Sequence, residues 1–244
     1  MIIHDCIQGS QEWLSLRAGI PTASEFDSIL TPGGKLSAAA DKYMYRLLAE
    51  RIMGHPTLQA VTTWMDRGTE LEKRAVGCYE FITDTETVKV GFMTNDSTTI
   101  GASPDRLVGD RGLLEIKCTS EAIHVGYLLS NKGVDKAYYP QVQGQLWIAE
   151  RQWDDVLSWH HEMPEALIRV ERDEEYIEKL AGEVMKFSAR LEEMTEQLKR
   201  DCIIKPKATP KEYGAEFLTP EQEEALYIGI REQNLSAMRE QMAG

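Results

Sequence analysis

Apolar residues recur at helical spacing over several stretches of the chain and alternate with polar residues over others. Periodicity, caps and breakers predict helices over residues 10–17, 22–30, 38–53, 62–82, 120–130, 138–150 and 173–200. Alternation predicts strands over 87–93, 99–102, 156–160 and 166–170, and a strand–turn–strand unit over 101–117. The chain therefore mixes helices and strands, with the strand–turn–strand unit near its middle.

Two of these helices have distinct apolar stripes. The expected stripe of the helix over 62–82 is Leu71, Ala75, Cys78, Tyr79 and Ile82, and that of the helix over 173–200 is Tyr176, Leu180, Val184, Phe187 and Leu191. Glu72 lies beside the first stripe. An acid in such a position is usually a surface residue, so periodicity alone gives Glu72 no role.

The strand–turn–strand unit carries the most informative polar residues. Side chains alternate along a strand, so Glu115 and Lys117 share one face and Ile116 points to the other. A hairpin return brings Asp105 back opposite that face. Two carboxylates at one place suit a hard divalent cation, and a lysine beside them suits phosphate or a metal-bound water. The alternative is a solvated hairpin with a surface Lys–Glu pair.

Three other polar groups suggest binding chemistry. Thr22, followed three residues later by Glu25, predicts a capping box whose helix start attracts anions, with Arg17 and Ser24 beside it. A surface arginine and a helix-start serine are the alternative. Gln141, four residues before Gln145, shares a helix face with it and offers neutral donors and acceptors. Residues 160 and 161 are both histidine. Adjacent side chains of a strand point to opposite faces, so at most one of the two could join a given metal site.

Length and composition narrow the possibilities. The chain has 244 residues, which suits one large domain of residues 1–200 followed by a linker and a C-terminal helical extension over 201–244. With 27 basic against 40 acidic residues the net charge is −13, which argues weakly against a nucleic-acid-coating surface and still permits a basic channel. Four dispersed cysteines without a CxxC pair disfavour zinc and iron–sulfur sites. No signal-peptide pattern or long apolar run is present, so a cytoplasmic protein without membrane association is expected.

Taken together, these residues resemble the phage-lambda-type alkaline exonucleases, the viral recombinase branch of the PD-(D/E)xK nuclease superfamily. The resemblance runs from about residue 8 to about residue 200 and rests on four blocks that occur in the same order. The blocks are Gly9-Ser10, Trp13-Leu14, Leu16-Arg17, Gly19 and Thr22-Ala23-Ser24; Gly68, Glu72, Ala75 and Tyr79-Glu80; Ser103-Pro104-Asp105 and Glu115-Ile116-Lys117-Cys118; and Gln141-Val142-Gln143 with Leu146-Trp147. The fold that this resemblance implies is α/β, a restriction-endonuclease-like core with a central mixed β-sheet flanked by helices.

The resemblance also implies a catalytic role for particular residues. Asp105, Glu115 and the backbone carbonyl of Ile116 match the family's metal ligands, and Glu72 matches the helix acid that completes the metal site. The resemblance thus overrides the surface interpretation of Glu72. Lys117 resembles the lysine that orients or deprotonates the attacking water. Gln141 matches the glutamine beside this site.

A second group matches the pocket that holds a terminal 5′-phosphate in this family. It consists of Arg17, Ser24 and Ser103. The family prototype has a further arginine after the Glu-x-Lys strand, where this chain has Glu121, Ile123 and His124, so His124 is the candidate substitute.

The function implied is a Mg²⁺-dependent 5′-to-3′ exonuclease acting on double-stranded DNA, in which Mn²⁺ should substitute for Mg²⁺. It would release 5′-mononucleotides and leave 3′ single-stranded overhangs for phage-type recombination by strand annealing. The resemblance further implies a ring-shaped homotrimer and a single-strand annealing protein as partner. Two alternatives stay open: an endonuclease of the same superfamily, and a non-catalytic DNA-binding module.

Overall fold

The computed structural model describes residues 1–57, 69–130 and 136–201. The chain divides into two units, Met1–Ile203 and Ile204–Gly244, and the description concerns the first. The linker and C-terminal helix predicted over 201–244 lie outside the described residues apart from residue 201, and so does the predicted helical segment 62–68. Among the described helices, none combines the length and apolar character needed to cross a membrane.

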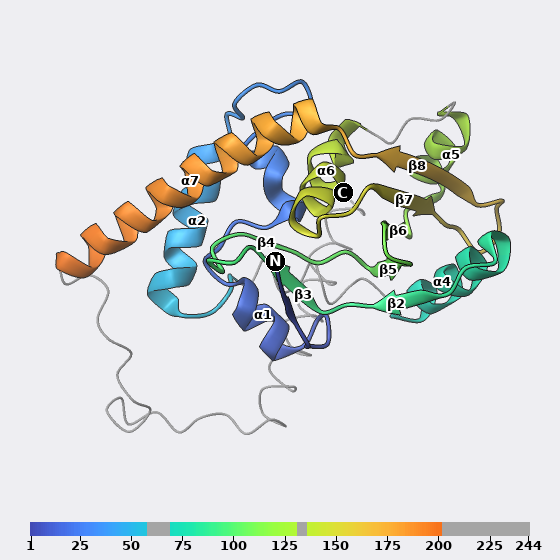
Figure 1. Cartoon of the computed structure of the whole chain (residues 1–244), viewed down its shortest axis with the longest axis horizontal. Helices are drawn as coiled ribbons and strands as arrows, with labels where there is room; N and C mark the ends of the chain where they lie inside the picture. The colour runs from blue at the N-terminus through green and yellow to red at the C-terminus, as the bar shows by residue number, and fades with distance from the viewer. Residues whose placement is uncertain (58–68, 131–135, 202–244) are drawn as a thin grey trace, which may run out of the picture. The chain divides into compact units, whose positions relative to one another are not determined.

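The central element is a five-stranded mixed sheet (Figure 1). Its strand order is β2 (Thr87–Lys89), β5 (Arg106–Val108), β6 (Gly112–Lys117), β7 (Trp153–Ser158) and β8 (Ala166–Glu171). Neighbouring strands are antiparallel except β6 and β7, which are parallel. A parallel pair needs a long crossover connection, and here the connection contains α5 (Glu121–Leu129), η2 (Lys136–Tyr138) and α6 (Tyr139–Ile148).

A smaller antiparallel sheet contains β1 (Ile2–His4), β3 (Phe92–Thr94) and β4 (Gly101–Ala102). The single strand predicted over 87–93 is therefore wrong, because the chain passes from β2 in one sheet to β3 in the other. Gly91 lies at this change of sheet, and a Cβ atom there would collide with the backbone carbonyl oxygens of His4 and Cys6. Glycine allows this close backbone approach, which an alternation pattern does not reveal.

The remaining helices are α1 (Gln11–Arg17), η1 (Ala23–Ser28), α2 (Ala40–Met53), α4 (Thr69–Thr83) and α7 (Glu174–Arg200). Ser10 caps α1 as predicted, since its hydroxyl accepts a hydrogen bond from the Trp13 N–H at 3.2 Å. The capping box at Thr22 is wrong: residues 23–28 form a 3₁₀ helix, and the Thr22 side chain makes no capping bond.

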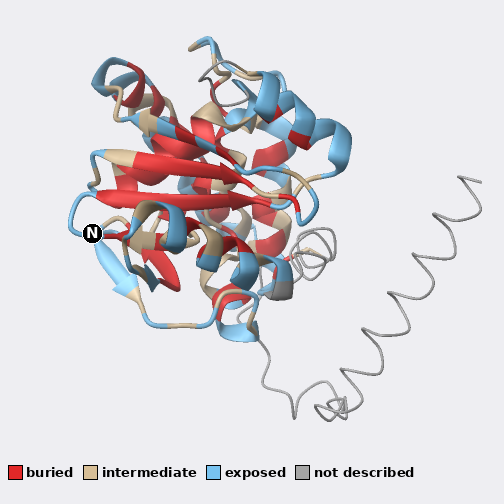
Figure 2. Cartoon of the chain, turned by 90° about the vertical axis from the view of Figure 1, so that its right-hand side faces the viewer, coloured by how far each residue is buried: buried red, intermediate tan, exposed pale blue. Residues whose placement is uncertain are grey.

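Helices cover both faces of the five-stranded sheet. On one face, Leu113 of β6 and Val156 of β7 join the larger core with residues of η1, α2, α6 and α7. On the other face, Leu114 and Ile116 join a smaller core with three residues of α4, namely Ala75, Val76 and Tyr79. Figure 2 shows that the central strands are almost wholly buried between these layers.

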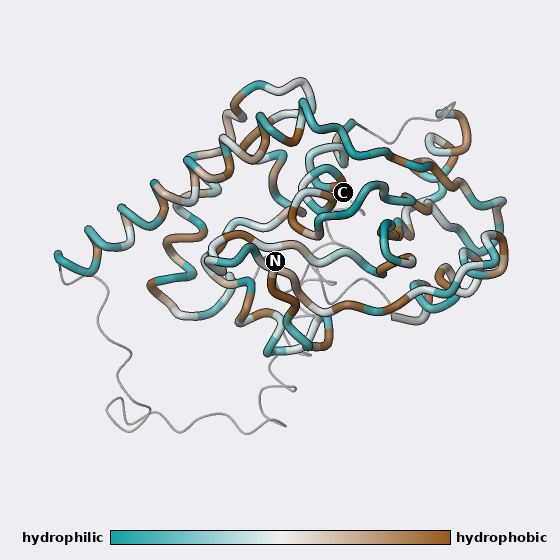
Figure 3. Tube along the Cα trace, in the orientation of Figure 1, coloured by the Kyte–Doolittle hydropathy of each residue, from teal (hydrophilic) through white to brown (hydrophobic). Residues whose placement is uncertain are grey.

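The stripe predicted for α7 is confirmed, because all five of its residues are buried. The last turns of α7 are mainly hydrophilic (Figure 3). The stripe predicted for α4 is displaced, because Leu71 and Ile82 are exposed and Val76 is buried. Glu72 precedes Ala75, Val76 and Tyr79 by three, four and seven residues, so it lies on the buried face of α4 instead of beside it.

Candidate active site

The β5–β6 hairpin brings the predicted acids together. Arg106 pairs with Leu114, so the register continued by one residue sets Asp105 opposite Glu115. The Asp105 Oδ2 atom accepts a hydrogen bond from the Ile116 N–H at 2.7 Å. A strand residue directs its N–H and its C=O to the same edge, so the Ile116 carbonyl faces the Asp105 side as well.

Glu115 and Lys117 form a buried ion pair supported by helix α6. The Lys117 ammonium donates to Glu115 Oε1 at 2.7 Å and to Gln141 Oε1 at 3.2 Å. The Gln141 amide donates to the same Glu115 oxygen at 2.7 Å, and the Gln145 amide donates to Glu115 Oε2 at 2.8 Å. Glu115 and Lys117 are only 1% and 5% exposed, so the alternative of a solvated surface pair is excluded.

A further acid, Asp154 of β7, was not identified from the sequence. Asp154 pairs with Leu113 and Val156 with Glu115, so Asp154 and Glu115 share a face of the sheet. Asp154 is fully buried, and neither of its carboxylate oxygens has a hydrogen-bond partner among the described residues. The sequence-predicted strand began at residue 156, and the alternation that reveals this orientation requires the strand to begin at Trp153.

The electrostatics of these acids indicate a missing positive charge. Burial, and then the charge of Glu115, raises the pKa of Asp105 to about 8. Burial, followed by Glu115 and Asp105, holds the pKa of Asp154 well above its usual range. Lys117 is the cation that lowers both pKa values, and one ammonium does not balance three carboxylates. A bound divalent cation would reverse this imbalance.

The donor set fits a magnesium ion. Asp105, Glu115 and the Ile116 carbonyl would supply oxygen ligands, and Mg²⁺ usually binds through one or two carboxylates while it keeps several waters. Within the described parts of the chain, no three or more His, Cys, Asp or Glu side chains already surround one point. The protein therefore offers a partial ligand shell that water and substrate oxygens would complete.

Glu72 does not reach the other two acids in this structure. Its Oε1 atom lies 3.2 Å from the Arg106 guanidinium, and its side chain is 30% exposed. It is close enough to Asp105 for its charge to contribute to the raised pKa of that carboxyl. The role of Glu72 as a metal ligand thus stays a prediction.

Three of the four predicted phosphate-binding residues come together. Arg17 donates to Ser24 Oγ at 3.1 Å and to Ser103 Oγ at 3.3 Å. Two residues that the sequence interpretation did not assign to this group also belong to it. Arg17 donates to Thr22 Oγ1 at 3.3 Å, and the Trp13 indole, which lies under the guanidinium at 4.3 Å, donates to Ser103 Oγ at 2.9 Å. Hydroxyls around a fixed guanidinium form a suitable anion site.

His124 is not brought to this group. It is fully buried on α5, where its Nδ1 atom lies 2.7 Å from Ser158 Oγ and its Nε2 atom lies 2.9 Å from the Pro164 carbonyl oxygen. Both ring nitrogens are thus engaged away from Arg17. His160 and His161 follow the end of β7, and His161 is half exposed.

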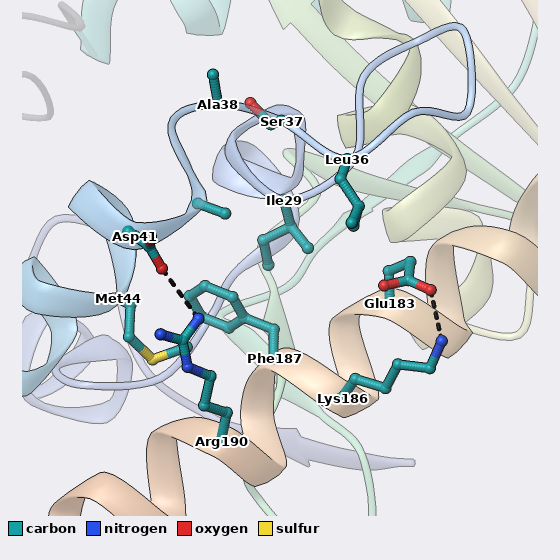
Figure 4. A pocket seen from close by; sticks show the side chains of 11 residues that line it. Ile29, Leu36, Ser37, Ala38, Asp41, Met44, Glu183, Lys186, Phe187 and Arg190 are labelled. Carbon is teal, nitrogen blue, oxygen red and sulfur yellow. Dashed lines mark hydrogen bonds and ion pairs between the residues drawn. The ribbon is translucent and has the colours of Figure 1, made fainter.

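A separate pocket of about 380 Å³ opens between α2, α7 and the loop after η1 (Figure 4). Its four charged side chains pair with one another: Arg190 with Asp41 at 2.9 Å and Lys186 with Glu183 at 2.6 Å. Ile29, Met44 and Phe187 supply apolar contacts. This pocket therefore lacks the surplus charge that marks the sites described above.

Comparisons with known proteins identify the family and the fold. The family model for the YqaJ-like viral recombinase domain matches residues 12–152. The crystal structure of an alkaline exonuclease (LHK-Exo) from Laribacter hongkongensis is 34% identical and has a TM-score of 0.70; the match covers 80% of this chain and 98% of that one. The same values hold for LHK-Exo in complex with dAMP. A comparison with curated proteins gave no match.

A phage-related exonuclease from Haemophilus somnus 129PT shares the fold at 15% identity with a TM-score of 0.58, over 73% of this chain and 96% of that one. The predicted α/β fold of the PD-(D/E)xK type, a mixed sheet flanked by helices, is confirmed.

Proposed function

Because the chain belongs to the YqaJ-like viral recombinase family, we propose that it is a Mg²⁺-dependent exonuclease that degrades one strand of duplex DNA in the 5′-to-3′ direction. The reaction would release 5′-mononucleotides and leave a 3′ single-stranded overhang for recombination by strand annealing. The description of the Laribacter protein as an alkaline exonuclease, and its complex with dAMP, support this proposal.

The observation that carries the proposal is the short link between the two groups of polar residues. Ser103 belongs to the group around Arg17, and Asp105, two residues later, belongs to the acidic group. Residues two apart in an extended chain are about 7 Å apart. A terminal phosphate held by Arg17 would therefore place a nearby phosphodiester of the same strand against the acids. Such binding would explain why the enzyme needs a DNA end and why it degrades the strand in the 5′-to-3′ direction.

The side chains divide the chemical work. Asp105, Glu115 and the Ile116 carbonyl would hold the metal, and Glu72 is proposed to complete its ligands. Bound there, a divalent metal would polarise the phosphoryl oxygen and lower the pKa of water. Lys117 contacts Glu115 at 2.7 Å and Gln141 at 3.2 Å, and it would hold the attacking water and offset charge on the phosphate.

The family resemblance also supports a proposed assembly. We infer a homotrimeric ring that encloses duplex DNA, and a single-strand annealing protein as the partner that receives the 3′ strand. The net charge of −13 is compatible with a ring that is acidic on the outside and basic in its channel. Light scattering of the full chain tests the trimer directly: a monomer in solution would refute the ring.

The test of the proposed function uses linear duplex DNA, labelled at one end, with and without a 5′-phosphate, in Mg²⁺. We expect the phosphorylated 5′ strand to be degraded fastest, the labelled 3′ strand to survive, and mononucleotides to accumulate. A closed circular duplex should remain intact. A cut circle would favour an endonuclease, and wild-type protein that degrades neither DNA in Mg²⁺ or Mn²⁺ would refute a nuclease function.

Two pairs of variants show which residues act. Asp105→Ala should abolish activity, whereas Asp110→Ala, in the exposed turn of the same hairpin, should retain it. Arg17→Ala should weaken the preference for phosphorylated ends, whereas Arg190→Ala, in a surface ion pair, should not. Equal activity of Asp105→Ala and Asp110→Ala would refute the role of Asp105 at the active site. An equal preference for phosphorylated ends in Arg17→Ala and Arg190→Ala would refute the role of Arg17 in phosphate binding.

A further inference from the structure

The Arg106 guanidinium contacts the carboxylate of Glu72 and the backbone carbonyl of the neighbouring Asp105. The Arg106 Nη2 atom lies 3.2 Å from Glu72 Oε1, and the Nη1 atom donates to the Asp105 backbone carbonyl at 2.9 Å. Arg106 therefore links helix α4 to the strand that carries Asp105.

The location of Arg106 makes this link firm. Arg106 pairs with Leu114, whose side chain packs with α4, so Arg106 lies under α4 on that face of the sheet. Its side chain is only 11% exposed, and a buried guanidinium is strongly unfavourable without a carboxylate partner. Hydrogen bonds from Thr87, and to a smaller extent the charge of Arg106, lower the pKa of Glu80, two turns along the same helix from Glu72, which agrees with a position of Arg106 beneath α4.

A carboxylate has two oxygens, and its contact with Arg106 uses only Oε1. Carboxylates that bind metals are usually held by hydrogen bonds from a second group, which fixes the direction of the free oxygen. We propose that Arg106 is a positioning residue that orients Glu72 toward the metal held by Asp105, an inference that rests on the proposed nuclease function. The fork of the guanidinium suits this task because its two nitrogens reach two acceptors at once.

The test measures metal binding without DNA, with Mn²⁺ as the probe and electron paramagnetic resonance of free Mn²⁺ as the readout. Asp105→Asn serves as the reference variant: the Mn²⁺ binding that this substitution abolishes is assigned to the proposed site. We expect Arg106→Gln to raise the Kd for Mn²⁺ by about tenfold, the lower end of the usual effect of losing such a partner. Arg111→Gln removes the same charge from the exposed turn of the hairpin and should leave the Kd unchanged.

Because Arg106 is buried, Arg106→Gln could fail to fold, and Arg106→Lys is the second variant. Lysine keeps the buried charge but offers one donor point in place of a fork, so we expect an intermediate loss of Mn²⁺ affinity and a normal unfolding transition. Combining Arg106→Lys with Glu72→Gln then shows whether Arg106 affects Mn²⁺ binding through Glu72. If Arg106 acts through Glu72, Arg106→Lys should change the Kd in the wild type and change it little when Glu72 is already replaced.

Three results would overturn the proposal. The first is Mn²⁺ affinity in folded Arg106→Lys equal to that of the wild type. The second is an equal effect of the substitution with and without Glu72, which would indicate a general charge effect. The third is a wild-type protein that binds no Mn²⁺, which would refute the metal site itself. Wild-type protein that binds Mn²⁺ through Asp105 and degrades no DNA would instead refute the proposed function, and the Arg106 result could still be interpreted.

Discussion

Replacing Asp105 by asparagine should inactivate the protein and make its metal-free form more stable. Asparagine keeps the size of the side chain and an oxygen that accepts the Ile116 N–H bond, but it carries no charge. The pKa of Asp105 rises from 3.8 to about 8 in the folded protein. Between these values the folded state binds the proton more tightly than the unfolded chain, so stability falls as the pH rises through this window.

The size of the gain follows from the same shift. A pH of 7 lies about three units above the unfolded pKa of 3.8, and each unit corresponds to about 1.4 kcal/mol. The stability gained by removing the charge therefore has an upper limit of about 4 kcal/mol. Asp105 is partly exposed, and solvent with local relaxation should reduce this to about 2 kcal/mol. The gain should shrink toward zero as the pH falls toward 4 and should keep rising between pH 7 and pH 8, because the folded pKa lies near 8.

Urea unfolding in the presence of EDTA at pH 5, 7 and 8 measures this difference. Asp110→Asn, in the exposed turn of the same hairpin, is the matched control and should change stability by no more than about 0.5 kcal/mol. Added Mg²⁺ should stabilise the wild type and not Asp105→Asn, because we expect only the wild type to bind it. A variant no more stable than the wild type at pH 8, or a gain that is equal at pH 5 and pH 8, would refute the electrostatic reasoning.

Three further outcomes are expected. Arg17→Ala should reduce the ratio of kcat/KM for 5′-phosphorylated over 5′-hydroxyl duplex ends by about tenfold or more, since a charged hydrogen bond contributes about 1.5–3 kcal/mol, and an unchanged ratio would argue against the phosphate pocket. Gln145→Leu should cost about 1–3 kcal/mol in urea unfolding because Glu115 Oε2 loses its donor while buried; a neutral effect would show that the contact at 2.8 Å contributes little. Gly144→Ala should cost about 1–3 kcal/mol because its Cβ atom would collide with an aromatic ring of η1, whereas Gly182→Ala, in open space on α7, should be neutral or stabilising; equal effects would contradict the close packing.

The β5–β6 hairpin could be predicted because local rules determine it. Alternation assigns Glu115 and Lys117 to one face, and a short turn sets the register that returns Asp105. The stripe of α7 was likewise predictable, since a 27-residue helix with one buried face shows its period clearly. Both follow from residues close together in the sequence.

Other features depend on contacts that no local pattern contains. Gly91 separates β2 from β3 because the backbone of His4 and Cys6 lies against it. Thr22 joins Arg17 instead of capping a helix because residues 23–28 wind as a 3₁₀ helix under α6. The partner of Glu72 was hidden for the same reason, since Arg106 reaches it only after the hairpin packs under α4. These are tertiary effects that override local preference.

Asp154 shows how a local conflict can identify function. A fully buried carboxylate without a hydrogen bond destabilises a folded chain, and a leucine or asparagine at the same place would fit the sheet at lower cost. Its nearest charged neighbours include Glu115 and Asp105, so the conflict coincides with the proposed metal site instead of being spread through the core. Local rules are broken most often where a site requires it. The charge that is missing around these three acids is positive, and the cation that would supply it is the one the proposed reaction needs.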